Sequence, residues 1–251
     1  MEKEIKNKVA IVTGGSKGIG SAIVEEFLCH GAKAVVIVDR EESQGIELME
    51  KLNIQYGDGK AIFFKADVTR DLDEIYKKVV EKYQTIDILV NNAGIVDETS
   101  IRRTLDVNTI ATVEWSMKFL NHMRKDKGGN GGTILNIASI YGYTVDPVVP
   151  FYKTSKFAVM GFTRTLGHVK NYEITKVRVF ALCPGLTRTS IHAAGKLYAL
   201  DFLEEVTRNV ISTVSYQEKE DVAKAAIEAF KTAQSGSAWS IINGEPIQEI
   251  V

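Results

Sequence analysis

Short apolar runs alternate with longer amphipathic stretches along the whole chain. The apolar runs are rich in valine and isoleucine and lack strict polar alternation, which is typical of strands buried on both faces of a sheet. Seven strands are therefore predicted, at Val9–Val12, Ala34–Val38, Ala61–Lys65, Ile86–Val90, Thr133–Ile137, Val177–Leu182 and Ala238–Ile242. The stretches between them predict helices near residues 19–30, 42–56, 71–83, 103–125, 151–171 and 220–233.

This alternation predicts one α/β domain over residues 1–251. Strand–helix–strand units with short connections build a parallel sheet covered by helices on both faces. The glycine-rich segment 128–132 is short enough to be a turn and not a domain boundary. Residues 186–217 break the rhythm directly after a strand, at the edge where ligands bind in such sheets. We expect a substrate lid there; a pair of packing helices is the alternative.

A glycine-rich turn follows the first strand and leads into the first helix. Its glycines, in Thr13–Gly20, let a phosphate approach the N–H groups at the helix N-terminus. Asp39 ends the second strand, where a carboxylate can accept hydrogen bonds from the ribose of an adenine dinucleotide and repel a 2′-phosphate. Lys17 and Arg40 could instead bind that 2′-phosphate. The directly placed carboxylate favours NAD, with NADP as the alternative.

Tyr152 and Lys156 carry the candidate chemistry. Residues four apart lie on one face of a helix, and a fixed ammonium beside a phenol favours the phenolate. A free tyrosine has a pKa of about 10, so such a neighbour brings the phenol toward the range of a general base. Ser139, on another element, could hold the oxygen that gains or loses the proton. A half-buried ring beside a solvated lysine is the structural alternative.

The composition is that of an ordinary globular protein. Hydrophobic residues make up 45% and the net charge is -1, so no basic block indicates nucleic acid or an anionic membrane. No apolar run approaches the roughly 20 residues that span a bilayer, and the charged N-terminus does not predict a signal peptide. The two cysteines and four histidines lack metal-ligand spacing. We therefore expect a cytoplasmic protein without a metal.

In order and spacing, these motifs resemble the short-chain dehydrogenase/reductase family over residues 8–186, and more loosely to the C-terminus. The resemblance implies a Rossmann-type doubly wound parallel sheet of seven strands in the order 3-2-1-4-5-6-7. It implies catalytic roles for Asn108, Ser139, Tyr152 and Lys156. It also implies cofactor contacts from residues of the family's binding motifs: Gly14, Ser16, Lys17, Gly18, Ile19, Gly20, Asp39, Arg40, Asp67, Val68, Asn91, Ala93, Gly94, Tyr152, Lys156, Pro184, Gly185, Leu186, Thr187 and Thr189.

Segments 128–139, 162–164, 183–189 and 236–239 further resemble the hydroxyprostaglandin dehydrogenases and the insect-type alcohol dehydrogenases, which oxidise secondary alcohols with NAD. This implies reversible hydride transfer to the nicotinamide. In it Tyr152 is the general acid/base, Lys156 lowers its pKa and Ser139 orients the substrate oxygen. Asn108 is expected to kink its helix and to hold a water that relays the proton.

The expected substrate is a small hydrophobic alcohol or ketone, because the candidate pocket residues are largely apolar. Substrate contacts are predicted for Ser139, Val145, Tyr152, Leu186 and Ile191. An NADPH-dependent carbonyl reductase and a non-catalytic cofactor-binding regulatory protein are the alternatives.

Two of the expected helices, 103–125 and 151–171, carry apolar residues on more than one face. These are Trp115, Phe119, Met123, Phe157, Met160 and Phe162. Members of the family pair these two helices across a two-fold axis, so the resemblance implies a homodimer or homotetramer.

Overall fold

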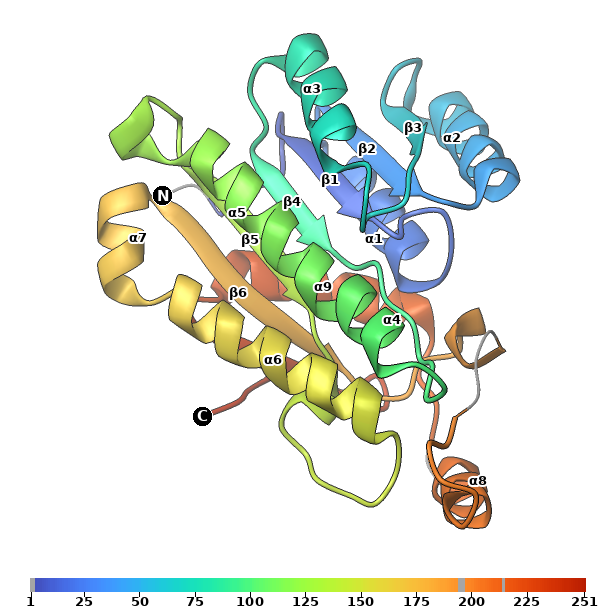
Figure 1. Ribbon diagram of the computed structural model, residues 1–251. Helices are drawn as coiled ribbons and strands as arrows, with labels where there is room; N and C mark the ends of the chain where they lie inside the picture. The colour runs from blue at the N-terminus through green and yellow to red at the C-terminus, as the bar shows by residue number, and fades with distance from the viewer. Residues whose placement is uncertain (1–2, 194–196, 214) are drawn as a thin grey trace.

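One sheet runs through the molecule (Figure 1). The computed structural model describes residues 3–193, 197–213 and 215–251. The strands are β1 (Val9–Thr13), β2 (Ala34–Asp39), β3 (Ala61–Lys65), β4 (Ile88–Asn91), β5 (Gly132–Ile137), β6 (Val177–Pro184), β7 (Ala238–Ile241) and β8 (Gln248–Glu249). Their order is β3-β2-β1-β4-β5-β6-β7-β8, and β1 to β7 pair in parallel, which confirms the predicted topology.

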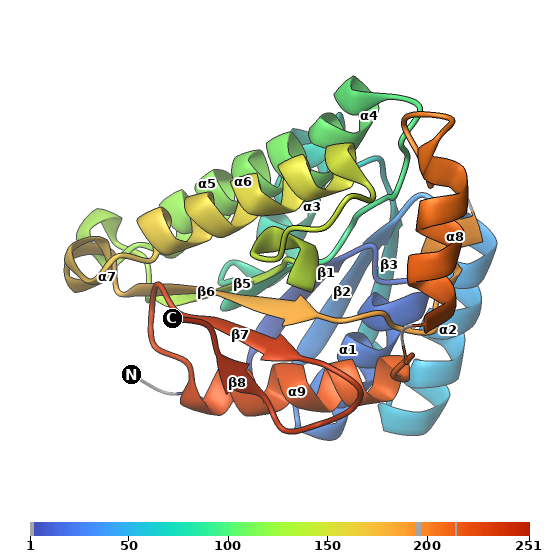
Figure 2. The ribbon, with the colours of Figure 1, turned by 90° about the horizontal axis from the view of Figure 1, so that it is seen from below.

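Helices cover the sheet on both faces (Figure 2). One layer holds α1 (Gly18–Cys29), α2 (Glu42–Tyr56) and α9 (Lys219–Thr232). The other holds α3 (Leu72–Tyr83), α5 (Ala111–Met123) and α6 (Pro150–Leu166). Within β1, Ala10 and Val12 pack toward the first layer, and Val9 and Ile11 toward the second. Burial on both faces is why the strands read as continuous apolar runs.

The predicted helix 103–125 is three segments. Helix α4 (Ile101–Leu105) is followed by a π-helical turn at Asp106–Ile110 and then by α5. The π turn contains Asn108, where the sequence predicted a kink, and such turns are frequent at functional sites. The predicted helix 151–171 also divides, into α6 and α7 (Val169–Thr175), because His168 caps a new helix through its ring nitrogen.

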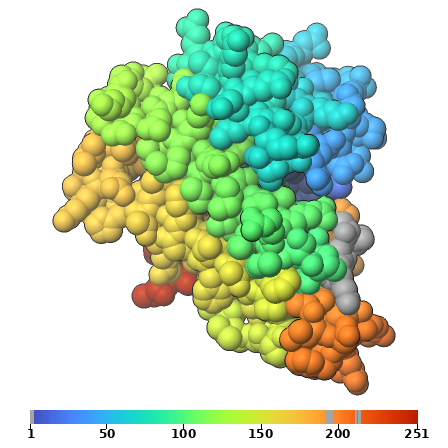
Figure 3. All heavy atoms as spheres, in the orientation of Figure 1, coloured from blue at the N-terminus to red at the C-terminus, as the bar shows by residue number. Residues whose placement is uncertain are grey.

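The segment 186–217, which follows β6, is closed at its base by an isolated β-bridge between Thr187 and Gln217. It contains a 3-10 turn, Ser190–Ala193, and α8 (Leu203–Thr213). In the space-filling view this segment forms an orange lobe beside the start of α6 (Figure 3). Its position at the carboxyl end of β6 supports the lid interpretation, which stays a prediction.

Strand β8 was missing from the sequence prediction. It is antiparallel to β7, and the Arg164 guanidinium donates a hydrogen bond to the carbonyl of Ile250 just beyond it. Both β8 residues are polar and exposed, so they carry no apolar signal. Among the helices described, none is long and apolar enough to cross a membrane.

Candidate functional site

The carboxyl ends of the parallel strands open onto one cavity of about 290 Å³. Binding in doubly wound sheets takes place at this edge. The cavity gathers most of the site residues predicted from sequence: Gly14, Lys17, Gly18, Ile19, Asp39, Arg40, Asp67, Val68, Ala93, Gly94, Ser139, Tyr152, Lys156, Pro184, Gly185, Leu186, Thr187, Thr189 and Ile191. Five predicted residues do not line it: Ser16, Gly20, Asn91, Asn108 and Val145.

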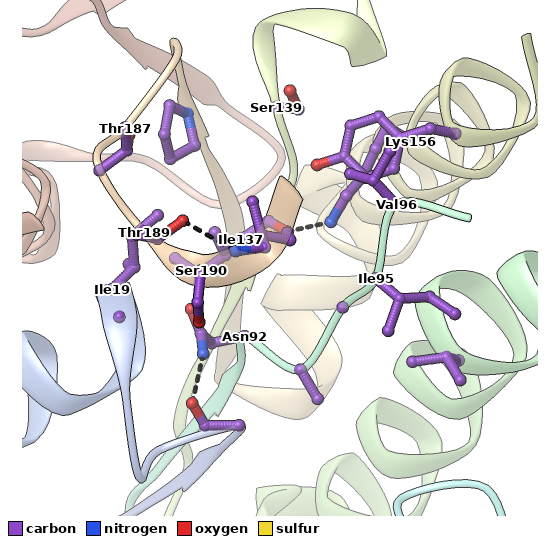
Figure 4. A pocket seen from close by; sticks show the side chains of 18 of the residues that line it. Ile19, Asn92, Ile95, Val96, Ile137, Ser139, Lys156, Thr187, Thr189 and Ser190 are labelled. Atoms are coloured by element: carbon purple, nitrogen blue, oxygen red, sulfur yellow. Dashed lines mark hydrogen bonds between the residues drawn. The ribbon is translucent and has the colours of Figure 1, made fainter. Parts of the chain in front are cut away.

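The glycine turn is packed so closely that side chains would not fit. Gly14 has φ +63°, and a Cβ there would lie 2.8 Å from the Cα of Ala93. A Cβ at Gly20 would lie 2.2 Å from the carbonyl oxygen of Gly14. The Asn92 amide donates to that same carbonyl oxygen at 2.9 Å (Figure 4). Gly20 therefore allows the close packing of the turn without lining the cavity, whereas Gly14 lines it.

No described side chain caps the N-terminus of α1, which begins at Gly18. The first N–H groups of a helix lack intrahelical partners and carry positive potential, so this end of the cavity suits a phosphate. A Cβ at Gly18 would lie 3.4 Å from Thr189, on the opposite wall. The turn and the segment after β6 thus form the two sides of a narrow cradle.

Asp39 is held in place by the glycine turn. Its Oδ2 accepts hydrogen bonds from the N–H of Ser16 at 3.0 Å and from the Ser16 hydroxyl at 2.5 Å. Ser16 therefore acts behind Asp39 and not at the cavity surface. Lys17 forms an ion pair with Glu41 at 3.7 Å, and Arg40 is exposed beside them. The carboxylate is fixed, whereas the two candidate 2′-phosphate ligands lie at the outer edge.

Asp67 lines the same part of the cavity. Its Oδ1 accepts from the N–H and hydroxyl of Thr69 at 3.0 and 2.7 Å. Burial opposes its ionisation, but these bonds and the charges of Arg70 and Arg40 outweigh burial and lower the pKa of Asp67. The residues present thus fit an adenine dinucleotide: N–H donors for its phosphates, and the carboxyl groups of Asp39 and Asp67 for its adenosine half.

Tyr152 and Lys156 lie on the buried side of α6, facing Ser139 at the end of β5. They are 9% and 4% exposed. The Lys156 Nζ donates to the carbonyl of Ile137 at 2.9 Å and lies 5.6 Å from the centre of the Tyr152 ring (Figure 4). One lysine thus contacts β5 and stands beside the phenol.

Burial, and not the neighbouring ammonium, dominates the proton equilibria of the pair. It raises the pKa of Tyr152 to about 12, although a hydrogen bond with Ser139 acts in the opposite direction. It lowers the pKa of Lys156 to about 8. The expected lowering of the phenol pKa by Lys156 is therefore not found in the protein alone, because the buried ammonium is itself destabilised.

Asn108 connects the loop after β4 to the catalytic helix from behind the cavity. Its Oδ1 accepts from the N–H of Ile95 at 2.8 Å, and its Nδ2 donates to the Ile95 carbonyl and to the Ser155 hydroxyl. The Ser155 hydroxyl donates to the carbonyl of Tyr152 at 2.6 Å. Asn108 lies close behind two residues that line the cavity, Gly94 and Ile95: a Cβ at Gly94 would lie 3.4 Å from the Asn108 Oδ1.

Two predicted contacts lie elsewhere. Asn91 is buried, and its amide donates to Ser116 and Asn136; Asn92, the next residue, lines the cavity instead. Val145 is 87% exposed and lies outside the cavity, so the structure does not support it as a substrate contact.

The cavity also includes residues that the sequence did not predict as pocket residues. Tyr141 meets the Tyr152 ring edge-on, with 6.3 Å between ring centres. Val96, Val148 and Thr207 also line the cavity, together with Val149 and Leu197, which the sequence had suggested as apolar pocket residues. The only sequence signal for Tyr141 is its position two residues after Ser139.

The burial of Lys156 has a consequence for stability. With a pKa of about 8 in the folded state and 10.5 as the ordinary value, folded Lys156 binds fewer protons between these pH values than the unfolded chain does. The free energy of unfolding therefore rises with pH between about 8 and 10.5. As the pH falls through this window the stabilisation is lost, because the buried Lys156 must then take up a proton. Relative to Lys156→Met, we expect the wild-type free energy of unfolding to rise by ~2 kcal/mol from pH 7.5 to 10.

Urea unfolding of the two proteins at stepped pH values measures this difference. The same titration of Lys153→Met provides the control, because Lys153 is also buried but its ammonium is paired with the carboxylate of Asp146. A wild-type curve that stays parallel to the Lys156→Met curve would show that Lys156 has an ordinary pKa.

Known proteins are similar to this chain in sequence and in architecture. Residues 8–197 match the family model of the short chain dehydrogenases. A 15-hydroxyprostaglandin dehydrogenase (NAD+) of Rattus norvegicus is 38% identical over 189 residues, which cover 74% of this chain and 71% of that protein. Alcohol dehydrogenase 1 of Ceratitis cosyra is 31% identical over 206 residues, covering 80% and 79%.

A solved structure, the 3-ketoacyl-(acyl-carrier-protein) reductase from Brucella melitensis complexed with NADH, has a TM-score of 0.79 to this chain. It is 26% identical, and the match covers 96% of this chain and 99% of that one. The similarity to the reductase therefore extends beyond the segment matched by the family model.

Proposed function

The chain belongs to the short-chain dehydrogenase family, and we propose that it interconverts a hydrophobic secondary alcohol and its ketone with NAD as the hydride acceptor. The observation that carries this proposal is the single cavity that holds Ser139, Tyr152 and Lys156 together with the glycine turn and Asp39. The names of two relatives support this proposal, because one is a 15-hydroxyprostaglandin dehydrogenase (NAD+) and the other is an alcohol dehydrogenase.

Tyr152 takes the hydroxyl proton during oxidation and returns it during reduction. With a pKa of about 12, Tyr152 stays protonated at neutral pH in the protein alone, so added positive charge is needed to form the phenolate that accepts the proton. Bound NAD+ supplies the hydride acceptor and a positive ring charge. Ser139, already hydrogen-bonded to the phenol, holds the substrate oxygen in the position where negative charge develops.

The catalytic group argues against a protein that only binds a cofactor. A regulatory protein needs the glycine turn and Asp39, but it has no need of a buried lysine beside a buried tyrosine. The alternative of an NADPH-dependent carbonyl reductase rests on Lys17 and Arg40. Lys17 is paired with Glu41 at the outer edge, whereas Asp39 is fixed by two hydrogen bonds, which favours NAD.

The substrate side of the cavity indicates an uncharged molecule. Its wall is apolar, and apart from Lys156 its described residues near Tyr152 carry no cationic side chain that would pair with a carboxylate or phosphate. Thr207, on α8, has a buried hydroxyl without a hydrogen-bond partner among the described residues. Buried hydroxyls are rarely left unpaired, so a second oxygen on the substrate would satisfy it.

The test is the absorbance of NADH formed from NAD, and in parallel of NADPH formed from NADP, with secondary alcohols of increasing apolar bulk. Half of the panel carries a second hydroxyl or carbonyl, and half lacks it. We expect turnover with NAD that increases with apolar bulk and further with the second oxygen. Turnover by NADP alone would favour the reductase, and tight cofactor binding without turnover would favour the regulatory protein.

We also propose that the protein is a homodimer or homotetramer. Of the residues that suggested this, Trp115, Phe119, Met123 and Met160 are buried within the protomer and cannot form the interface, whereas Phe157 on α6 is exposed. Ile110 on the π turn and Met117 on α5 are exposed as well.

Phe157→Glu should therefore give a monomer in sedimentation velocity, whereas the same change at Ile54, which is exposed on α2, should leave the assembly intact. A wild-type protein that sediments only as a monomer would contradict the proposal. A cytoplasmic location stays a prediction.

A further inference from the structure

Glu98 is a buried carboxylate that the proposed chemistry does not use. It lies in the loop between β4 and α4, is 2% exposed and does not line the cavity. Its Oε2 accepts a hydrogen bond from the N–H of Phe151 at 3.0 Å, and its Oε1 accepts one from the N–H of Tyr152 at 2.8 Å. Each oxygen thus binds one residue in the first turn of the catalytic helix.

Helix α6 cannot supply these acceptors itself. Its N-cap residue is Val149, which has no side-chain acceptor and a left-handed backbone with φ +47° and ψ 56°. Pro150 follows and has no N–H, and the N–H of Lys153 bonds to the Val149 carbonyl. The two N–H groups that remain are those bound by Glu98, so a distant loop provides the cap. Burial raises the pKa of Glu98, and the two hydrogen bonds from the helix N–H groups oppose this effect.

The neighbouring Asp97 offers a matched comparison. It is also buried, at 5% exposure, but its carboxylate bonds to Thr99 and Arg103 within its own segment. No hydrogen bond from Asp97 to α6 is present among the described residues. The two adjacent carboxylates therefore differ mainly in whether they contact the catalytic helix.

We propose that Glu98 is a positioning residue that holds Tyr152 in place for proton transfer, by binding the backbone of α6 at Tyr152 itself. The inference rests on the proposed function, because it assigns Tyr152 the proton. Glu98→Gln keeps the size of the side chain but replaces one acceptor by an NH2 group that faces a backbone N–H. A displacement of about 1 Å at the reacting group can cost about 100-fold in rate.

The experiment compares Glu98→Gln with Asp97→Asn by steady-state kinetics, with kcat expressed per cofactor-binding site counted by fluorescence titration. We expect Glu98→Gln to lower kcat about 10- to 100-fold, with KM for the alcohol and Kd for NAD within about 2-fold of wild type. Asp97→Asn should keep kcat within about 2-fold, even where its Tm falls as far as that of Glu98→Gln. An unchanged kcat in Glu98→Gln, or equal losses in both variants, would overturn the proposal.

A second measurement separates this inference from the proposed function. Hydrogen exchange should accelerate at least about 5-fold in Glu98→Gln at whichever of the Phe151 and Tyr152 amides faces the new NH2 group, because a lost hydrogen bond removes about 1 kcal/mol or more of protection. The same amides should be unaffected in Asp97→Asn. A wild-type protein that does not turn over alcohols would contradict the proposed function. The hydrogen-exchange rates would then still test whether Glu98 holds the backbone of α6. Equal exchange in both variants would overturn the positioning role.

Discussion

Tyr152→Phe should lower kcat for alcohol oxidation by about 10²- to 10⁴-fold, the range found for a positioned acid–base group. The phenylalanine ring fits the same space, and the hydrogen bond of the Lys156 Nζ to Ile137 is unaffected. The one atom lost is the phenol oxygen, with its bond to Ser139. Single-turnover formation of NADH measures the loss, and fluorescence titration should show the Kd for NAD unchanged.

Tyr141→Phe is the matched control for this prediction. Tyr141 is the other phenol in the cavity wall, and burial raises its pKa to about 12 as well. Its ring packs against Tyr152, but it has no assigned part in proton transfer. We expect kcat to fall no more than about 3-fold, the effect of one neutral hydrogen bond. If Tyr141→Phe lost more activity than Tyr152→Phe, the assignment of the two phenols would have to be exchanged.

The sequence predicted the parts of the fold whose signals are local. Continuous apolar runs located β1 to β7, since burial on both faces needs no information beyond the run itself. The glycine turn and Asp39 could be placed because a strand end and a helix start on either side fix their surroundings. The division at Asn108 was expected only as a kink; the structure shows a π turn there, with the Asn108 side chain hydrogen-bonded to the backbone of Ile95.

The parts that could not be predicted depend on tertiary contacts. Asn91 and Asn92 are indistinguishable in sequence, but Asn91 is the last residue of β4 paired with β5, so its side chain is enclosed. The high pKa of Tyr152 comes from burial, which a Tyr-x-x-x-Lys pattern does not reveal. Glu98 contacts Tyr152 across 54 positions of the chain, and no periodicity relates the two.

Asp39→Ala should change the cofactor preference of the enzyme. Loss of a charged hydrogen-bond acceptor costs about 1.5–3 kcal/mol, or about 10- to 100-fold in kcat/KM with NAD. With NADP we expect an increase of a few fold or more, because the carboxylate that repels a 2′-phosphate is gone and Lys17 and Arg40 lie beside it. The ratio of the two kcat/KM values is the measurement, since it cancels general damage to the site.

Two further variants distinguish the possible causes of a change in the ratio of kcat/KM with NAD to kcat/KM with NADP. Asp39→Asn keeps an acceptor for the Ser16 N–H and removes only the charge, so a gain with NADP there assigns the effect to repulsion. Glu41→Gln releases Lys17 from its ion pair while Asp39 stays in place. It should slightly raise kcat/KM with NADP and leave kcat/KM with NAD unchanged. If Asp39→Ala loses activity equally with both cofactors, Asp39 serves only to hold the turn through Ser16, and the preference for NAD must come from other residues.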